Sequence, residues 1–394
     1  MSAIAGNIRR DGQIVGLISF GHLLSHVYML SLPPLFPVLR AELGFTYVEL
    51  GLAMTMFAVA TGSLQTPMGF LCERVGARFV LIAGLIINSA AIIAVGFVDS
   101  LLNLCVFMAL AGVGSSVFHP ADYSIISGSV SEERIGRAFA IHTFGGAAGF
   151  ALAPVIMVGL AAIFDWRTAF MLAGGAGIVV AIIILTFSGV ITEGEGKKKE
   201  GEQLSLRQLL TSRPILLFFL FYAAAAAANV GINQFSVAAM TEIYGVPLAL
   251  ANSVLTLYLF SAMFGVLPGG WVADKTTHPG LILIGGMGLA GALIAFVGFE
   301  GLPFWFALGL LATVGATRGF VQSSRDVMVR AIAPKASVGT VFGFVTTGFL
   351  VGQAISPPIY GLLLDLGSPG VVFWISAGFS AICLMTMLPV LARR

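Results

Sequence analysis

Charged side chains are scarce in this sequence. They make up 10% of its 394 residues, whereas a soluble globular domain carries about 25%. Hydrophobic residues make up 58% of the chain, and its mean hydropathy is +1.00. Most of the chain therefore has no water to face, which excludes a soluble globular protein and indicates a membrane protein.

Cysteine is also rare, and a nucleotide-binding loop is missing. The three cysteines, Cys72, Cys105 and Cys383, lie in or beside apolar stretches at no metal-ligand spacing, so we expect them to be packing residues. No G-x-x-x-x-G-K-[ST] pattern occurs, so ATP is not the expected energy source. The polar start of the chain and the long apolar run after it do not fit a cleavable signal peptide.

Long apolar segments are what the chain has in abundance. Each is near the roughly 20 residues that cross a bilayer as a helix, and the sequence contains twelve of them. They lie at about 14–39, 46–71, 79–98, 101–128, 136–163, 168–190, 215–240, 247–271, 279–299, 303–331, 339–365 and 370–391. The predicted fold class is therefore an all-α membrane protein with twelve transmembrane helices.

Lysine and arginine are distributed unequally between the two sides of the membrane. With the N-terminus inside, the outer side receives only Arg40 and Arg167. The inner side receives sixteen: Arg9, Arg10, Arg74, Arg78, Arg134, Arg137, Lys197, Lys198, Lys199, Arg207, Arg213, Lys275, Arg330, Lys335, Arg393 and Arg394. Because positive residues stay inside, we predict that both termini are cytoplasmic. The remaining two, Arg318 and Arg325, fall within the membrane.

The stretch from Gly112 to Pro154 recurs 203 residues later, from Gly315 to Pro357. Matched glycines and prolines in register reflect backbone requirements, such as close helix approach and a helix bend. The matching positions are Gly112, Gly136, Phe139, Thr143, Gly145, Gly149, Ala151 and Pro154, against Gly315, Gly339, Phe342, Thr346, Gly348, Gly352, Ala354 and Pro357. The chain is thus predicted to contain two pseudo-symmetric six-helix halves.

One polar stretch separates these halves. Residues 192–212 include the Lys197–Lys199 run, and a short surface helix is expected near 204–210. The predicted organisation is an N-terminal half at 1–190, a cytoplasmic linker at 191–213 and a C-terminal half at 214–394.

A glycine-rich charged turn follows the second apolar segment, and a similar turn recurs in the second half. The first turn contains Gly69, Glu73, Arg74, Gly76 and Arg78, and the second turn contains Asp274 and Lys275. Its acids can accept hydrogen bonds from a helix N-terminus or an arginine. We interpret both turns as conformational latches.

The Gly-x-Leu-x-Glu-Arg-x-Gly-x-Arg turn and the two repeated halves resemble the major facilitator superfamily over the whole chain. Gly21-His22, Leu32-Pro33 and the run from Gly114 to Ala121 are similar to its fosmidomycin-resistance branch of exporters. The chain has His26 where that branch has an acid, and Met108 where the superfamily motif has an arginine. The resemblance implies a transporter of drugs or metabolites, with export favoured.

Two polar stripes lie in repeat-equivalent segments. Arg318, Gln322 and Arg325 are spaced i, i+4 and i+7, so they share a helix face. Their equivalents in the first half are Ser115, His119 and Asp122. We expect the two stripes to face a common cavity, because ionisable groups in a membrane cost a few kcal/mol and need a reason. The alternative for Arg325 is a structural pair with Asp122 or Asp326.

Helical i, i+4 pairs add further candidates: His22 with His26, and Asn229 with Asn233. Membrane histidines often only bond a neighbouring helix, but four of the five, including His142, fall within apolar segments. We assign substrate contact to Arg318, Gln322, Asn229, Asn233, Ser115 and His22, and proton coupling to His26, His119, Asp122 and Arg325. Zinc binding by His22 and His26 is not expected, because no third ligand lies on the same helix.

Together these features predict a secondary transporter, not an enzyme, working by alternating access in a bacterial-type inner membrane. Arg318 indicates an anionic substrate, and the titratable residues indicate proton coupling. We expect a lipid-embedded monomer with no cofactor, metal or nucleic-acid partner. The alternatives are proton-coupled uptake of a small organic anion and a non-transporting membrane sensor or assembly factor.

Overall fold

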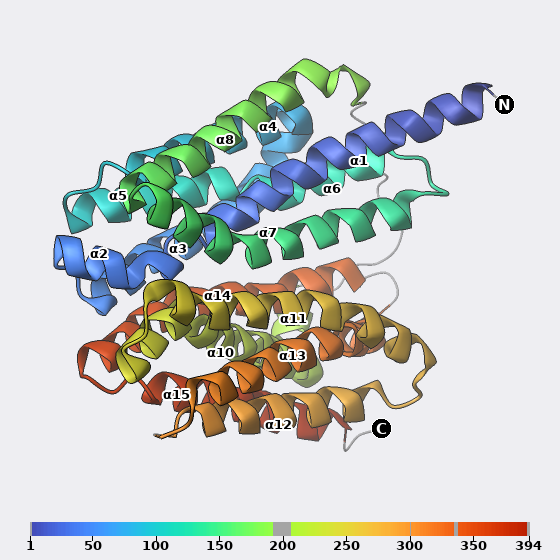
Figure 1. Cartoon of the computed structure of the whole chain (residues 1–394). Helices are drawn as coiled ribbons and strands as arrows, with labels where there is room; N and C mark the ends of the chain where they lie inside the picture. The colour runs from blue at the N-terminus through green and yellow to red at the C-terminus, as the bar shows by residue number, and fades with distance from the viewer. Residues whose placement is uncertain (1, 192–205, 300, 335–337, 392–394) are drawn as a thin grey trace. The chain divides into compact units, whose positions relative to one another are not determined.

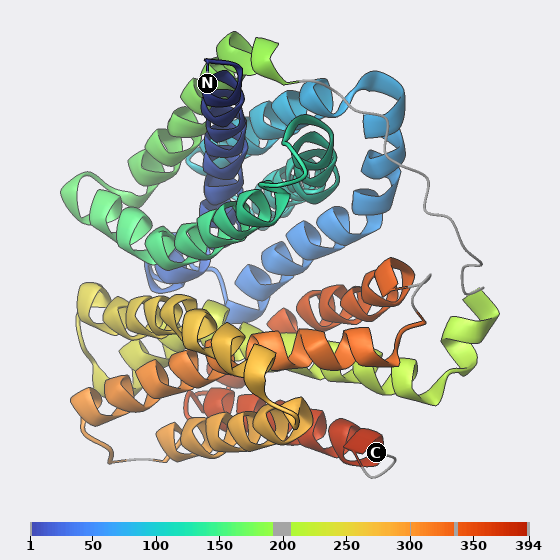
Figure 2. The same cartoon turned by 90° about the vertical axis from the view of Figure 1, so that its right-hand side faces the viewer.

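A computed structural model of the chain describes residues 2–191, 206–299, 301–334 and 338–391. The described residues form helices and connections, with no strand among them (Figures 1 and 2). The first ten elements are α1 (Ser2–Met29), η1 (Pro33–Leu35), α2 (Phe36–Leu43), α3 (Tyr47–Val75), α4 (Ala77–Val95), α5 (Leu101–Ser115), α6 (Phe118–Ser129), α7 (Ile135–Ile163), α8 (Trp166–Phe187) and η2 (Ser188–Val190). The remaining seven are α9 (Leu206–Thr211), α10 (Arg213–Tyr244), α11 (Leu248–Lys275), α12 (Pro279–Val297), α13 (Phe304–Ile332), α14 (Val338–Asp365) and α15 (Val371–Leu391).

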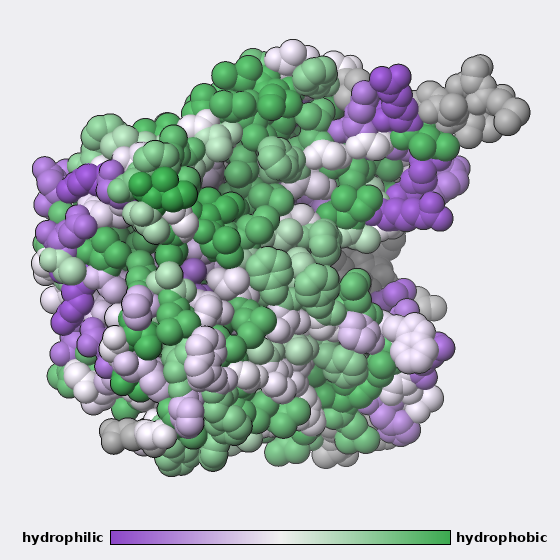
Figure 3. Space-filling model, in the orientation of Figure 1, coloured by the Kyte–Doolittle hydropathy of each residue, from purple (hydrophilic) through white to green (hydrophobic). Residues whose placement is uncertain are grey.

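The twelve predicted membrane spans are confirmed. Twelve stretches of the described chain are long and apolar enough to cross a bilayer, from Ile8–Leu43 to Val371–Val390. Large hydrophobic side chains are exposed on their flanks, such as Leu102 and Leu267. Figure 3 shows hydrophobic surface along the helices and hydrophilic residues gathered at their ends. Flanks of this kind suit lipid rather than water, so the protein is a multi-pass membrane protein.

The chain divides into two compact units. One consists of Met1–Leu43 and Met56–Lys198, and the other of Gly44–Thr55 and Lys199–Arg394. The start of α3 thus groups with the second unit, where the Tyr47 and Val48 amides donate to the Asp365 carboxylate at 3.0 and 2.9 Å. The division predicted at 191–213 stays a prediction, because 192–205 lie outside the described residues. Lys197–Lys199 and Lys335 lie outside them too; the expected surface helix is seen as α9.

Equivalent helices pack in the same pairs in both units. In the first, α1 packs on α7, and α4 packs on α5 and α8. In the second, α10 packs on α14, and α12 packs on α13 and α15. These three pairings therefore recur in both units, as the sequence repeat predicts.

The repeated glycines of α7 and α14 explain one of these pairings. A β-carbon at Gly149 would collide with the carbonyl oxygen of Leu23 on α1. Its repeat partner Gly352 stands in the same relation to the carbonyl oxygen of Ala223 on α10. Each pair of helices is therefore in backbone contact, which only glycine permits.

The span predicted at 101–128 is two helices rather than one. The first, α5, ends at Ser115, and α6 begins at Phe118. Pro120 lies in the first turn of α6, where its missing N–H is tolerated; the repeat-equivalent residue in the continuous α13 is Ser323. Ser116 and Val117, which join α5 to α6, keep right-handed helical backbone angles. The shared face of Ser115, His119 and Asp122 therefore stays a prediction.

Candidate functional site

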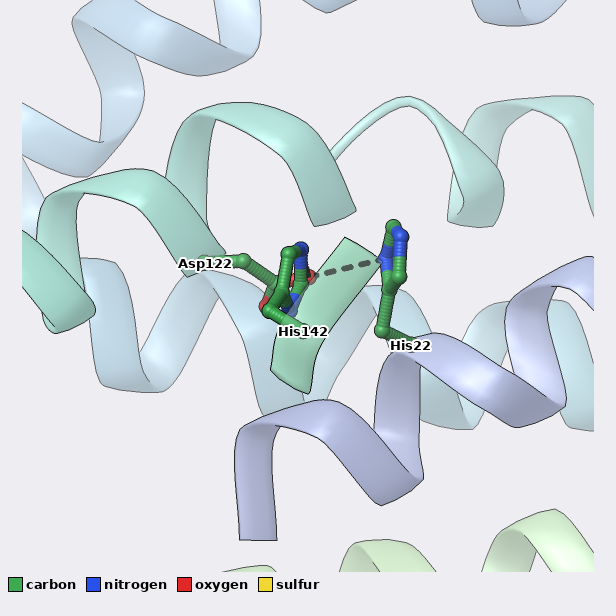
Figure 4. A group of neighbouring side chains, drawn as sticks. All are labelled: His22, Asp122 and His142. Carbon is green, nitrogen blue, oxygen red and sulfur yellow. Dashed lines mark ion pairs between the residues drawn. The ribbon is translucent and has the colours of Figure 1, made fainter. Parts of the chain in front are cut away.

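Three helices of the first unit bring titratable side chains to one point. His22 comes from α1, Asp122 from α6 and His142 from α7, and the three point toward one another (Figure 4). Nδ1 of His22 lies 3.1 Å from Oδ2 of Asp122, and Nε2 of His142 lies 3.7 Å from the same oxygen. A carboxylate between two imidazoles can balance the charge of one protonated ring.

This site is sealed from solvent. The exposed fractions are 0% for Asp122, 3% for His22 and 1% for His142. Neither Asp122 oxygen has an aligned hydrogen bond among the described residues, and neither does either ring nitrogen of His142. His22 and Asp122 are therefore close enough to form an ion pair, but their atoms are not aligned for a hydrogen bond. Buried polar groups in this condition are costly and call for an explanation.

The other membrane histidines surround this point. Ring centroids of His26, His119 and His142 lie 4.4, 5.3 and 3.9 Å from that of His22. On the outside of the group, Phe150 packs edge-on against His26 at 4.4 Å. We call His22, His26, His119, Asp122 and His142 the histidine cluster.

Gly146 of α7 makes room for the cluster. A β-carbon there would lie 2.9 Å from Nε2 of His22 and 3.0 Å from Cε1 of His26. With a larger residue at this position the two imidazole rings of α1 would have to move, so glycine suits their observed placement beside α7.

The structure thus brings together four residues that the sequence singled out, and it adds His142. No role was assigned to His142, although its position inside an apolar segment was a signal that it shares with the other three. Ser115 ends α5 and is buried. None of the ion-pair or ring contacts of the histidine cluster among the described residues involves Ser115.

A second polar site lies inside the other unit, around Arg318 of α13. Nη1 of Arg318 donates to Oδ1 of Asn229 on α10 and, at 3.2 Å, to the hydroxyl of Tyr258. Nη2 donates to Oγ of Ser380 at 3.4 Å, and Nε is buried with no hydrogen-bond partner among the residues that the structure describes. All these acceptors are neutral, so none of them balances the positive charge of the guanidinium, and its Nε–H is left to bind another acceptor.

Arg318 lines a cavity of ≈ 50 Å³ within this unit. The polar lining residues are Asn229, Arg318, Gln322 and Arg325, and the apolar ones are Phe221, Ala225, Leu283, Met287 and Val321. The stripe predicted on α13 therefore does converge on one space. Asn233 is not among the lining residues, and Tyr258 and Ser380, which hold Arg318, were not foreseen.

Arg325 differs from Arg318 because its charge is balanced. Its Nε and Nη2 both lie 2.9 Å from Oδ1 of Asp326. Its guanidinium lies 4.7 Å from the ring centre of Tyr222, whose hydroxyl donates to the same carboxylate at 3.2 Å. This is the structural pairing with Asp326 that the sequence left open.

The two charged turns are on the surface of their units. Gly76 precedes α4 with φ +100°, a conformation that favours glycine. Arg78 donates to the carbonyl oxygen of Ser188 at 3.4 Å, and Lys275 lies 4.0 Å from the ring centre of Trp271. The remaining charged residues of these turns, Glu73, Arg74 and Asp274, are exposed.

Comparison with known proteins agrees with this architecture. The model of the Major Facilitator Superfamily matches residues 18–239 and 224–394. The membrane sensor protein UhpC of Escherichia coli (strain K12) is 25% identical over 367 residues, covering 86% of this chain and 83% of the relative. The fosmidomycin resistance protein of the same strain is 24% identical over 383 residues, covering 95% and 92%.

Among solved structures, a bacterial homolog of the human lysosomal transporter Spinster, in an inward-facing and unoccupied conformation, has a similar fold. Its TM-score is 0.73 at 17% identity, over 97% of this chain and 95% of that chain. Both repeated halves thus have the predicted fold, and the family model covers nearly the whole sequence. The chain belongs to the Major Facilitator Superfamily of membrane transporters and is not an enzyme.

Proposed function

We propose that this protein is a proton-coupled secondary transporter that moves a small organic anion across the cytoplasmic membrane by alternating access, with export as the favoured direction. The observation that carries the proposal is Arg318, a membrane arginine whose side-chain hydrogen bonds within the described part of the chain are all to neutral groups. A cation without a counter-ion in the membrane is costly and marks a binding site for an anion. Similarity to a fosmidomycin resistance protein supports the export direction.

The substrate site consists of Arg318 with Asn229 and Gln322 beside it. A guanidinium can bind a carboxylate, phosphonate or phosphate through two parallel hydrogen bonds, and Asn229 and Tyr258 hold its plane in place. The ≈ 50 Å³ cavity is smaller than a metabolite, so substrate entry requires the lining helices to move apart. Asn233 and Ser115 remain proposed substrate contacts.

Proton coupling belongs to the histidine cluster. Imidazoles and a carboxylate are the groups that exchange protons near neutral pH with modest changes of environment. The sequence indicates both substrate contact and proton coupling for His22, and its approach to Asp122 at 3.1 Å favours the coupling role. The Arg325–Asp326 pair is satisfied locally, which favours a structural role for Arg325.

The proposed topology places both termini in the cytoplasm. Its support is the excess of sixteen cationic residues on that side over two on the other. Of those two, Arg167 donates to the carbonyl oxygens of Gly96 and Val98 at 3.2 and 2.8 Å. The turns at Gly69–Arg78 and Asp274–Lys275 then lie on the cytoplasmic side, where we propose that they act as conformational latches.

Two alternatives have support of their own. Proton-coupled uptake would use the same two sites with the opposite direction of flux. A non-transporting sensor is the alternative from another class, supported by 25% identity to the membrane sensor protein UhpC.

Transport by purified protein in liposomes separates these functions. The probes are labelled fosmidomycin, glycerol 3-phosphate and D-galactonate, which represent phosphonates, phosphate esters and carboxylates, with and without an imposed pH gradient. We expect at least one probe to move faster under the gradient than in empty liposomes, and the direction that is accelerated distinguishes export from uptake. Specific binding of a probe without any flux would support the sensor. Protein that neither binds nor moves any of the three anions would overturn the anion assignment.

A further inference from the structure

His22, Asp122 and His142 present ligand atoms from three different helices to one space inside the first unit. These atoms all lie within 4.8 Å of one another (Figure 4). We propose that the three side chains bind one divalent transition-metal cation of the Zn²⁺ or Co²⁺ type. The site uses residues to which proton coupling is assigned, but metal binding requires neither a substrate nor transport.

The geometry is close to that of a three-ligand metal site. Metal–ligand bonds of about 2.0–2.1 Å at tetrahedral angles place neighbouring ligand atoms about 3.3 Å apart. The observed distances from Oδ2 of Asp122 are 3.1 Å to Nδ1 of His22 and 3.7 Å to Nε2 of His142. The third pair, the two imidazole ligand atoms, lies within 4.8 Å, and binding of an ion would bring these atoms to the tetrahedral spacing.

Burial and lost hydrogen bonds point to a ligand at this place. Asp122 and His142 are more than nine-tenths buried, and the described residues offer their oxygen and nitrogen atoms no aligned hydrogen bond. A cation would satisfy both the carboxylate and the ring nitrogens at once. Gly146 keeps the neighbouring volume open, because a β-carbon there would lie 2.9 Å from Nε2 of His22.

The donor set selects the class of cation. Two imidazoles and one carboxylate suit Zn²⁺, Co²⁺ or Ni²⁺, whereas Mg²⁺ and Ca²⁺ prefer oxygen ligands alone. Three protein ligands leave a fourth position open. His26 and His119, whose rings lie 4.4 and 5.3 Å from that of His22, are the candidates to fill it.

The ligands could not be combined from sequence spacing alone. In the chain His22 is close only to His26, and Asp122 only to His119, and each of these pairs lies on one helix. Asp122 and His142 join His22 only after α6 and α7 have packed against α1.

The test is metal binding by the full-length protein, purified without a polyhistidine tag. Titration with Co²⁺ is followed by visible absorption, and titration with Zn²⁺ by calorimetry. We expect one ion per chain in the wild type and at least about tenfold weaker binding in Asp122→Asn and His142→Gln, since each removes a ligand. His278→Gln is the matched control, because His278 is exposed and is the one histidine of the five outside the cluster.

Thermal unfolding gives a second readout, because a cation that binds only the folded protein raises its melting temperature with concentration. We expect this rise in the wild type and in His278→Gln, but not in Asp122→Asn. X-ray absorption of the wild type with Co²⁺ does not depend on any variant being folded, and it should show scattering from imidazole ligands. Absence of one-to-one binding, a Co²⁺ spectrum without imidazole, or unchanged affinity in both ligand variants would each overturn the proposal. Transport of the anionic probes is measured separately, so the two proposals fail independently.

Discussion

Substitution of Gly149 by alanine tests how the first unit holds its histidine cluster. A β-carbon at this position collides with the carbonyl oxygen of Leu23 and lies 2.8 Å from Cβ of His26. This carbonyl oxygen belongs to the backbone of α1, so a change of side-chain rotamer cannot relieve the clash. Alanine must therefore push α7 away from α1, and His22 and His26 must move with α1.

The expected magnitude follows from two opposing effects. Overpacking of a tight interior costs about 1–3 kcal/mol. Replacing glycine by alanine at an open helix position gains roughly 0.5–1 kcal/mol. Gly159 of the same helix is such a position, since a β-carbon there meets nothing within 4 Å. Both glycines lie inside α7, so both substitutions have this gain and it cancels between them. We therefore expect Gly149→Ala to be less stable than Gly159→Ala by about 1–3 kcal/mol, the overpacking cost alone.

The assay is thermal unfolding of both variants and the wild type in the same detergent. The order of melting temperatures should be Gly149→Ala below the wild type, and Gly159→Ala equal to it or above. Metal binding by Gly149→Ala should also be weaker, because its His22 is displaced. If Gly149→Ala melts with the wild type and binds metal normally, α1 and α7 are not packed as described.

Arg318→Lys should bind the transported anion at least about tenfold more weakly than the wild type, because hydrogen bonds to charged groups contribute about 1.5–3 kcal/mol and the paired donors are lost; normal affinity measured by equilibrium binding would contradict an anion-binding Arg318. Asp122→Asn should exchange substrate across liposomes but not accumulate it under a pH gradient, and gradient-driven accumulation equal to the wild type would remove Asp122 from coupling. A cysteine in place of Lys198 should react with membrane-impermeant maleimide only from the cytoplasmic side, and labelling in intact cells would reverse the topology. Hydrogen bonds from the backbone and side chain of Thr168 lower the pKa of Asp165 in the folded protein. The Asp165 carboxylate therefore stabilises the folded protein at pH values above the pKa that it has in the unfolded chain, and this stabilisation is lost as the pH falls through its lower pKa in the folded protein. The difference in melting temperature between the wild type and Asp165→Ala should accordingly be seen at pH 7 and shrink in acid, and a difference that grows in acid would contradict this sign.

The membrane spans and the repeat were predictable from sequence because they follow from local or periodic signals. Span length depends only on apolar run length, and Gly149 and Gly352 have the same requirement for close backbone contact in both units. The break before Phe118 was missed because its residues are as apolar as those of an unbroken span. Pro120 was the available signal, since proline favours the first turn of a helix.

The two candidate sites were predictable in part. Arg318 and Gln322 were found because their spacing along one helix predicts a shared face. Tyr258 and Ser380 were missed because hydroxyl groups are common in apolar spans and carry no charge to mark them. The role of His142 depends on the packing of α7 against α1, which sequence spacing does not encode.

Proton movement driven by the transported anion is the most direct test of the central claim, that one unit binds an organic anion and the other a proton. Liposomes containing the protein and a trapped pH-sensitive dye receive the probe anion that the purified protein moves. We expect a change of internal pH with the wild type, but none with a His22→Gln, His26→Gln, His119→Gln variant that still exchanges labelled substrate. A pH change of equal size in that variant, or substrate flux through the wild type without any pH change, would contradict it.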